Sequence, residues 1–129
     1  MFAMHFMITA TFLAVPSVLV EVLGLPTTVH WQVYLGVFAA SIAGTVPLVL
    51  FTERSGRGPQ LLILAILVAA VSQALLGAAL GHVVVVMIAL TAFFAVFNYL
   101  EARLPALLTL AAPGPERGAA LGIFATAQF

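Results

Sequence analysis

The sequence contains no cysteine, no lysine and no aspartate. Without cysteine the chain forms no disulfide, uses no catalytic thiolate and offers no thiolate ligand to a metal. Charged residues make up only 6% of the 129 residues, and the arginines balance the glutamates, so the formal net charge is zero. The chain therefore lacks the clustered basic surface by which proteins bind nucleic acid, and we expect no nucleic-acid partner.

Apolar residues are abundant instead. They make up 64% of the chain, and the mean hydropathy is +1.27. A soluble domain carries about a quarter charged residues, and a chain of this length cannot hide so much apolar surface from water. We therefore expect an integral membrane protein. The apolar N-terminus is not predicted to be a secretory signal, because no basic residue precedes Arg54.

Four apolar segments are long enough to cross a bilayer as helices. Each has 21 or 22 residues, which at about 1.5 Å per residue gives about 32 Å, close to the hydrocarbon thickness of about 30 Å. Helices are required because lipid cannot hydrogen-bond an open backbone. The predicted fold is an all-α polytopic membrane helix bundle with four complete transmembrane helices and a truncated fifth, covering residues 2–23, 31–52, 60–80, 83–104 and 117–129. The short fifth segment leads us to expect that residues 1–129 are a fragment.

The arginines predict the orientation in the membrane. If the predicted helices alternate in direction, Arg54, Arg57, Arg103 and Arg117 all fall on the side of the N-terminus, and no arginine falls on the other. Basic residues concentrate in cytoplasmic loops. We therefore expect the N-terminal side and the arginine-bearing loops to be cytoplasmic.

Polar residues inside the predicted helices are the candidates for function, because a charge in the bilayer is unfavourable. Glu101, near the cytoplasmic end of the fourth helix, is expected to pair with Arg54 or Arg57, in a structural ion pair or as part of a gate. Arg103 cannot share its face, because positions two apart point in different directions, and is expected to reach lipid phosphates. His5 is expected to be a packed or interfacial side chain, with a titrating group as the alternative.

Amides in the helices usually bind neighbouring helices, and three stand out: Gln73, Asn98 and Gln128. Phe94, Asn98 and Glu101 share one face at helical spacing, so we expect Phe94 and Asn98 to line a cavity, together with Gln128 on the fifth helix. The histidines lie too far apart for a metal site, and the sequence shows no aspartate, no glycine-rich phosphate loop, no metal-ligand cluster and no serine–histidine pair in a plausible frame. We expect no enzyme, no cofactor and no metal.

The segment Glu53-Arg54-Ser55-Gly56-Arg57 resembles the loop signature of the major facilitator superfamily, an acidic residue followed by Arg, any residue, Gly and Arg. Val49 and Gly58 depart from the signature in the way its weaker second copy does. Further stretches that resemble proton-driven efflux members of this family are 30–34, 97–105, 112–114, 117–118 and 122–129. The resemblance covers essentially the whole chain and implies helices seven to eleven, within the six-helix C-terminal half.

This resemblance implies alternating-access export of a small molecule, coupled to protons, across a bacterial cytoplasmic membrane. It also implies an N-terminal half of the same transporter as a partner. The implied cytoplasmic gate comprises Glu53, Arg54, Gly56, Arg57 and Glu101, with Glu53 facing a helix N-terminus of the other half and Arg57 paired with Glu101.

Two alternatives remain. A small multidrug exporter built as a dimer of four-helix subunits would fit the length, but such proteins keep a weak arginine bias and have no use for a fifth helix. A non-transporting membrane assembly subunit would use its small-residue stripes only for packing, and predicts no polar face on a cavity.

Overall fold

The computed structural model describes residues 2–78 and 81–128, and these form helices and turns with no strand. The α-helices are α1 (Phe2–Ser17), α2 (His30–Ser55), α3 (Gly58–Ala78), α4 (Val83–Ala111) and α5 (Arg117–Gln128). Short turns of other helix types are η1 (Val18–Val22), η2 (Thr27–Val29) and η3 (Gly114–Glu116). The predicted all-α class is confirmed.

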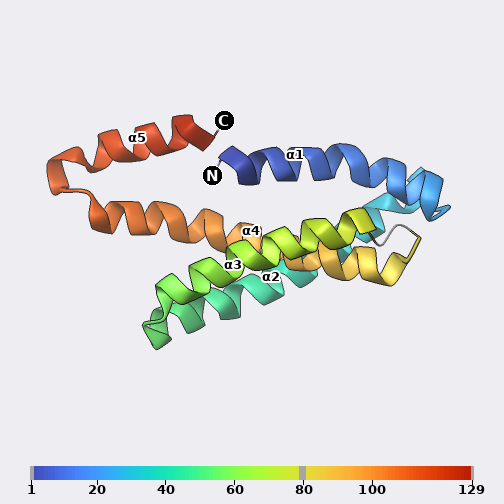
Figure 1. Ribbon diagram of the computed structural model, residues 1–129, viewed down its shortest axis with the longest axis horizontal. Coiled ribbons are helices and arrows are strands. Elements are labelled where there is room, and N and C mark those ends of the chain that lie inside the picture. Colours follow the sequence, from blue (N-terminus) through green and yellow to red (C-terminus); the bar gives the residue numbers. More distant parts are fainter. Residues whose placement is uncertain (1, 79–80, 129) are drawn as a thin grey trace.

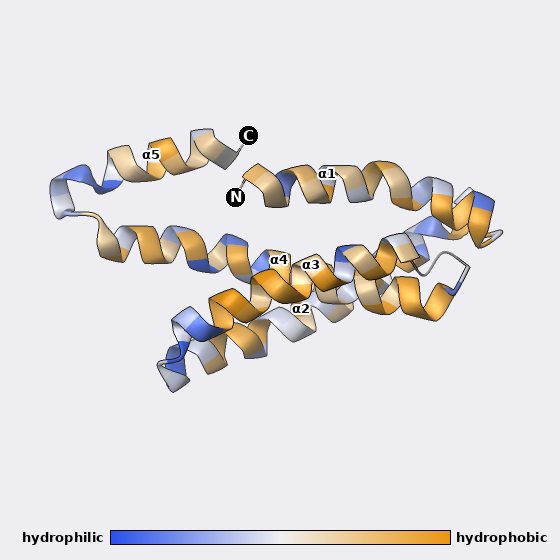
Figure 2. Cartoon of the chain, in the orientation of Figure 1, coloured by the Kyte–Doolittle hydropathy of each residue, from blue (hydrophilic) through white to orange (hydrophobic). Residues whose placement is uncertain are grey.

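Four of these helical stretches are long and apolar enough to cross a membrane, as the sequence predicts. They are apolar around most of their circumference, and α3 exposes Ile63, Leu64 and Leu67 on its outer side. Polar residues gather at the helix ends and in the connections (Figure 2). A helix that is apolar all round is stable where its surroundings are apolar as well, so the fold is a membrane helix bundle.

Helix α4 is the centre of the bundle. Half of its most apolar stretch is buried inside the bundle, against 17% or less of the corresponding stretch in each of the other three spanning helices. Helices α2 and α3 pack directly on α4, α1 runs beside α4 in the opposite direction and also contacts α3, and α5 folds back along the C-terminal part of α4 towards the start of α1 (Figure 1). The core is therefore built mainly from α4, with Phe93, Tyr99 and Leu100 fully enclosed.

Two predicted helix boundaries differ from the structure. Helix α4 does not end at Leu104 but continues through Pro105 to Ala111, so the proline costs the helix a backbone hydrogen bond without ending it. Helix α2 continues past Thr52 to Ser55 and ends where Gly56 adopts φ 66°. Part of the predicted loop 53–59 is thus the last turn of α2.

Pro16, near the end of α1, is followed by a wide helical turn. Helix α1 ends at Ser17 and passes into η1, where the Leu23 N–H donates to the Val18 carbonyl at 3.0 Å. This five-residue step is a π-type bond, and such turns commonly interrupt α-helices. Pro47, by contrast, lies inside a single α2 of 26 residues.

Candidate functional site

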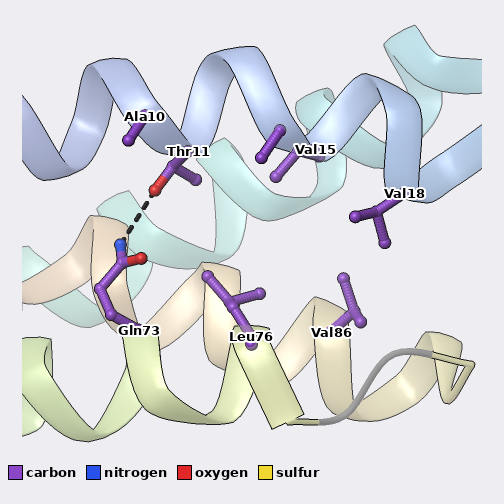
Figure 3. Close-up of a pocket in the computed structure, with 9 residues that line it drawn as sticks. Ala10, Thr11, Val15, Val18, Gln73, Leu76 and Val86 are labelled. Carbon is purple, nitrogen blue, oxygen red and sulfur yellow. Dashed lines mark hydrogen bonds between the residues drawn. The ribbon is translucent and has the colours of Figure 1, made fainter.

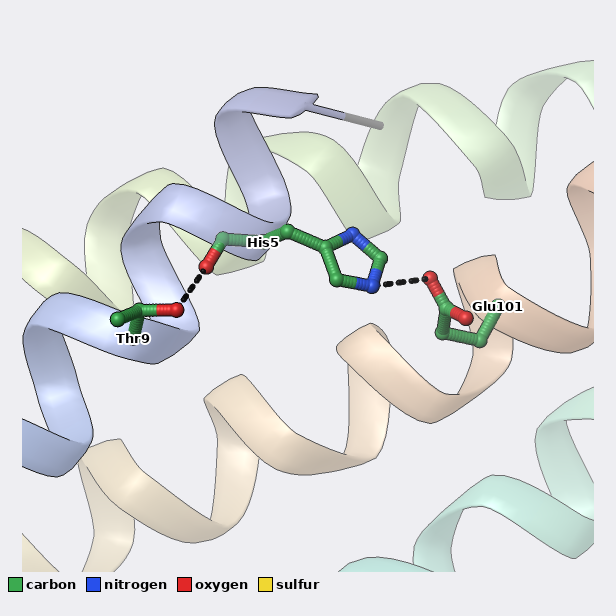
Figure 4. A network of polar contacts seen from close by, with 3 residues as sticks. All are labelled: His5, Thr9 and Glu101. Carbon is green, nitrogen blue, oxygen red and sulfur yellow. Dashed lines mark hydrogen bonds and ion pairs between the residues drawn. The ribbon is translucent and has the colours of Figure 1, made fainter. Parts of the chain in front are cut away.

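An ionisable pair joins α1 to α4. Nε2 of His5 lies 3.7 Å from Oε1 of Glu101, and the two side chains are 20% and 33% exposed (Figure 4). The edge of the His5 ring meets Phe97, with ring centroids 5.6 Å apart. Thr9 donates its hydroxyl to the backbone carbonyl of His5 at 2.9 Å, one turn further along α1. The pair is therefore held between two spanning helices, beside an aromatic ring.

This pairing differs from the expected one. Among residues 2–78 and 81–128, no ion pair within 4.0 Å joins Glu101 to Arg54 or Arg57. Both arginines are exposed at the end of α2, whereas Glu101 faces α1. The sequence predicts a packed or interfacial His5. It does not identify the partner, because Glu101 lies on α4, which His5 meets only in the folded structure.

The predicted gate residues lie at the turn between α2 and α3. Gly56 ends α2 in the left-handed region, and the Arg57 N–H donates to Oγ of Ser55 at 3.3 Å. The Arg57 carbonyl accepts a bond from the Leu61 N–H at 3.1 Å, so α3 begins immediately. Glu53, Arg54 and Arg57 are all exposed. Arg54 also stands in the last turn of α2, where a cation is favoured by the helix dipole.

Arg103 approaches this turn from α4. A methyl group built on Gly58 would lie 3.3 Å from Nη2 of Arg103 and 3.8 Å from Cγ2 of Thr52. The guanidinium is half-buried, and its Nε is enclosed without a hydrogen-bond partner in the described part of the chain. Glu101 and Arg103 therefore serve opposite sides of α4, one towards α1 and the other towards the α2–α3 turn.

The expected cavity residues have different surroundings. Phe94 is buried in an aromatic cluster, with ring centroids 4.9 Å from Phe38 and 5.6 Å from Phe12. It thus joins α1, α2 and α4 by packing. Asn98 is half-buried on α4. The side chain of Gln128 lies outside the described residues, so the structure does not place it.

A cavity of about 270 Å³ lies instead between α1, α3 and α4. Nε2 of Gln73 donates to the Thr11 hydroxyl oxygen at 2.9 Å, and that hydroxyl donates to the Met7 carbonyl at 2.8 Å. The rest of the lining is apolar, and the Gln73 amide oxygen points away from Thr11 into the space between the helices (Figure 3). Gln73 thus binds a neighbouring helix, as expected of an intramembrane amide.

The bundle is also joined by hydroxyl contacts on α2. Thr45 Oγ1 lies 2.9 Å from the Ala95 carbonyl of α4, and the Thr52 and Tyr99 hydroxyls share a buried hydrogen bond of 3.2 Å. No group of three histidine, cysteine or acidic side chains fit for a metal occurs within the described ranges. Each of these polar contacts therefore joins one helix to one neighbour.

No family model and no solved structure matches this sequence. Two membrane transporters are similar along almost all of it. The inner membrane transport protein YajR of Escherichia coli K12 is 29% identical over 126 residues, which are 98% of this chain and 28% of that protein. The uncharacterized transporter BU466 of Buchnera aphidicola is 27% identical over 128 residues, 99% of this chain and 33% of that protein.

The fold defines a helical integral membrane protein, and similarity to two transporters supports a role in transport rather than in catalysis. The chain spans about a third or less of the length of these relatives.

Proposed function

We propose that this chain is part of a secondary transporter that exports a small molecule across a bacterial cytoplasmic membrane by alternating access. The observation that supports transport is similarity along 98% or more of the chain to two membrane transporters. We further propose that residues 1–129 belong to the C-terminal half of a major facilitator superfamily protein. The signature-like turn at Glu53–Arg57 and the 28–33% of each relative that the chain spans favour this assignment.

The proposed cytoplasmic gate is the α2–α3 turn. Glu53, Arg54 and Arg57 are exposed around the left-handed Gly56, so they are available to a surface outside the described bundle. In this proposal Glu53 docks against a helix N-terminus of the N-terminal half, where the dipole favours a carboxylate. Releasing the turn opens the cytoplasmic side.

We propose that protons act through His5 and Glu101. Histidine changes charge near physiological pH, and ionisable pairs inside a membrane commonly mark proton pathways. When His5 is protonated, the 3.7 Å contact becomes an ion pair across α1 and α4.

Cysteine accessibility tests this proposal without knowledge of the substrate. The chain has no cysteine of its own, so Ser55→Cys at the end of α2 and Thr27→Cys in η2, just before α2, mark opposite ends of this spanning segment. Each is introduced into an otherwise cysteine-free full-length transporter in sealed vesicles and treated with a membrane-impermeant maleimide. Alternating access requires that a pH gradient change the two labelling rates in opposite directions.

Glu101→Gln is expected to abolish the response to the gradient while both cysteines still react. Labelling rates that do not respond to the pH gradient, or that both change in the same direction, contradict alternating access. Labelling of both cysteines from the same side would indicate two orientations in the membrane, the behaviour of a small multidrug exporter. The structure favours a bundle larger than a four-helix subunit, because α5 packs along α4.

A further inference from the structure

Positive charge gathers at the end of the bundle where α2 turns into α3. Arg54 is in the last turn of α2, Arg57 is in the connection, and Arg103 reaches the same turn from α4, with Nη2 3.3 Å from a methyl group built on Gly58. Glu53 is the acidic residue of this turn. Three arginines against one glutamate leave a net charge of +2.

The guanidinium of Arg103 has no counter-ion among the side chains that the structure describes. Its enclosed Nε has no acceptor there, and no carboxylate of those residues lies within 4.0 Å of the group. Glu101, two positions earlier on α4, faces α1 and His5 instead. A charged donor held in this way is unfavourable until an anion reaches it, and guanidinium binds phosphate through paired N–H groups.

The helix lengths place this turn at the depth of lipid phosphates. Helix α3 has 21 residues, about 32 Å, so Gly58 at its start lies near one boundary of a hydrocarbon core of about 30 Å. Helix α4 starts with Val83 at the opposite boundary, and about 20 residues later, close to Arg103, it has returned to the boundary at which Gly58 lies. Gly58 and Arg103 therefore meet at the membrane surface.

We propose that the phosphate of an anionic phospholipid binds at this turn. Arg103 and Arg57 supply the positive charge, and the guanidinium of Arg103 offers paired N–H groups to the phosphate oxygens. Gly58 leaves room for the Arg103 guanidinium because it has no side chain. A lipid is the occupant because the site faces the layer where such phosphates are concentrated, and basic sites between helices at the cytoplasmic surface bind anionic headgroups.

Native mass spectrometry of the protein in detergent, titrated with phosphatidylglycerol, tests the site. Arg103→Gln is expected to weaken binding about fivefold, the equivalent of about 1 kcal/mol for one arginine near the surface. The matched control is Arg117→Gln, which removes the same charge from an exposed arginine whose Nε bonds the Ala112 carbonyl. The control is expected to change binding less than about twofold, because Arg117 lies away from the turn.

Three outcomes would overturn the proposal: no effect of Arg103→Gln, equal losses in both variants, or displacement of the lipid by inorganic phosphate at matched concentration. Equal losses would indicate general surface charge, and displacement would indicate a soluble anion. Arg103→Lys keeps the charge but not the paired N–H groups, so partial binding is expected. If Arg103→Gln fails to fold by circular dichroism, Gly58→Leu gives the second test, because it displaces Nη2 while keeping every arginine, and unchanged lipid binding in that variant contradicts the site.

Discussion

Nε2 of His5 and Oε1 of Glu101 face each other at 3.7 Å across the contact between the first spanning helix and the central one. The two residues lie far apart in the sequence, so their meeting depends on α1 running antiparallel beside α4, with its first turns next to the C-terminal part of α4. Because both side chains have further contacts, the pairwise part of their interaction needs a double-mutant cycle.

We predict that His5→Gln and Glu101→Gln are not additive. Each alone should lower the free energy of unfolding by about 0.5–1 kcal/mol, since the pair is partly exposed, and the double variant should lose less than the sum of the two, because both substitutions break the same His5–Glu101 contact. Chemical unfolding in micelles measures the effect. His82→Gln, which changes an exposed histidine ahead of α4, is the control. Fully additive losses would show that the two side chains act independently.

The hydrogen bond between Gln73 and Thr11 is expected to stabilise the packing of α1 on α3. Gln73→Leu removes the 2.9 Å bond and should cost about 0.6–1.5 kcal/mol, the range for polar contacts between helices in membranes. Thermal unfolding in detergent provides the measurement. Gln60→Leu makes the same change at an exposed position at the start of α3 and should have a smaller effect. The interpretation fails if the Gln60 variant is destabilised as much.

Gly56→Ala should destabilise the α2–α3 turn. Gly56 has φ 66°, where a side chain clashes with the backbone at a cost of about 1–2 kcal/mol. Gly36→Ala adds the same methyl group to a helical position with nothing within 4 Å and should be neutral or stabilising, since alanine favours helix. Comparing the two melting temperatures checks the prediction. Equal shifts would mean that the left-handed conformation carries no constraint.

Phe94→Ala should be among the more damaging core substitutions. It removes ring contacts to Phe12 and Phe38 at 5.6 and 4.9 Å, and an enclosed Phe→Ala change costs about 3 kcal/mol or more. Phe6→Ala is the control, because Phe6 is 67% exposed on the outer face of α1. The fraction of folded protein after heating separates the two. A Phe6 variant as unstable as the Phe94 variant would contradict the cluster.

The spanning helices could be predicted because length and hydropathy alone decide whether a segment can satisfy its backbone in lipid. The ends could not. The fourth helix was expected to end at Leu104, but it continues through Pro105 to Ala111. Glu53 and Arg54 were expected in a loop, and the structure places them on the last turn of α2.

The sequence identified the residues of the candidate site better than it identified the partner of each residue. Helical spacing correctly separated Glu101 from Arg103 by face, but spacing does not say which helix each face meets. The structure directs Glu101 to His5 and Arg103 to Gly58, and these choices depend on how α1 and the α2–α3 turn are arranged around α4. The gate roles of Glu53, Arg54, Gly56 and Arg57 stay predictions.

The wide turn at Val18–Val22 gives α1 a tolerance to changes in chain length. A π-type turn holds one residue more than an α-helical path, so deleting the exposed Val20 should convert it into regular helix while Thr11 keeps its face. Deleting Leu13 instead would rotate everything that follows by about 100° relative to the preceding turns. The yield of folded protein from these two deletions should differ accordingly. Natural insertions and deletions of a single residue in this helix are therefore expected to gather at η1.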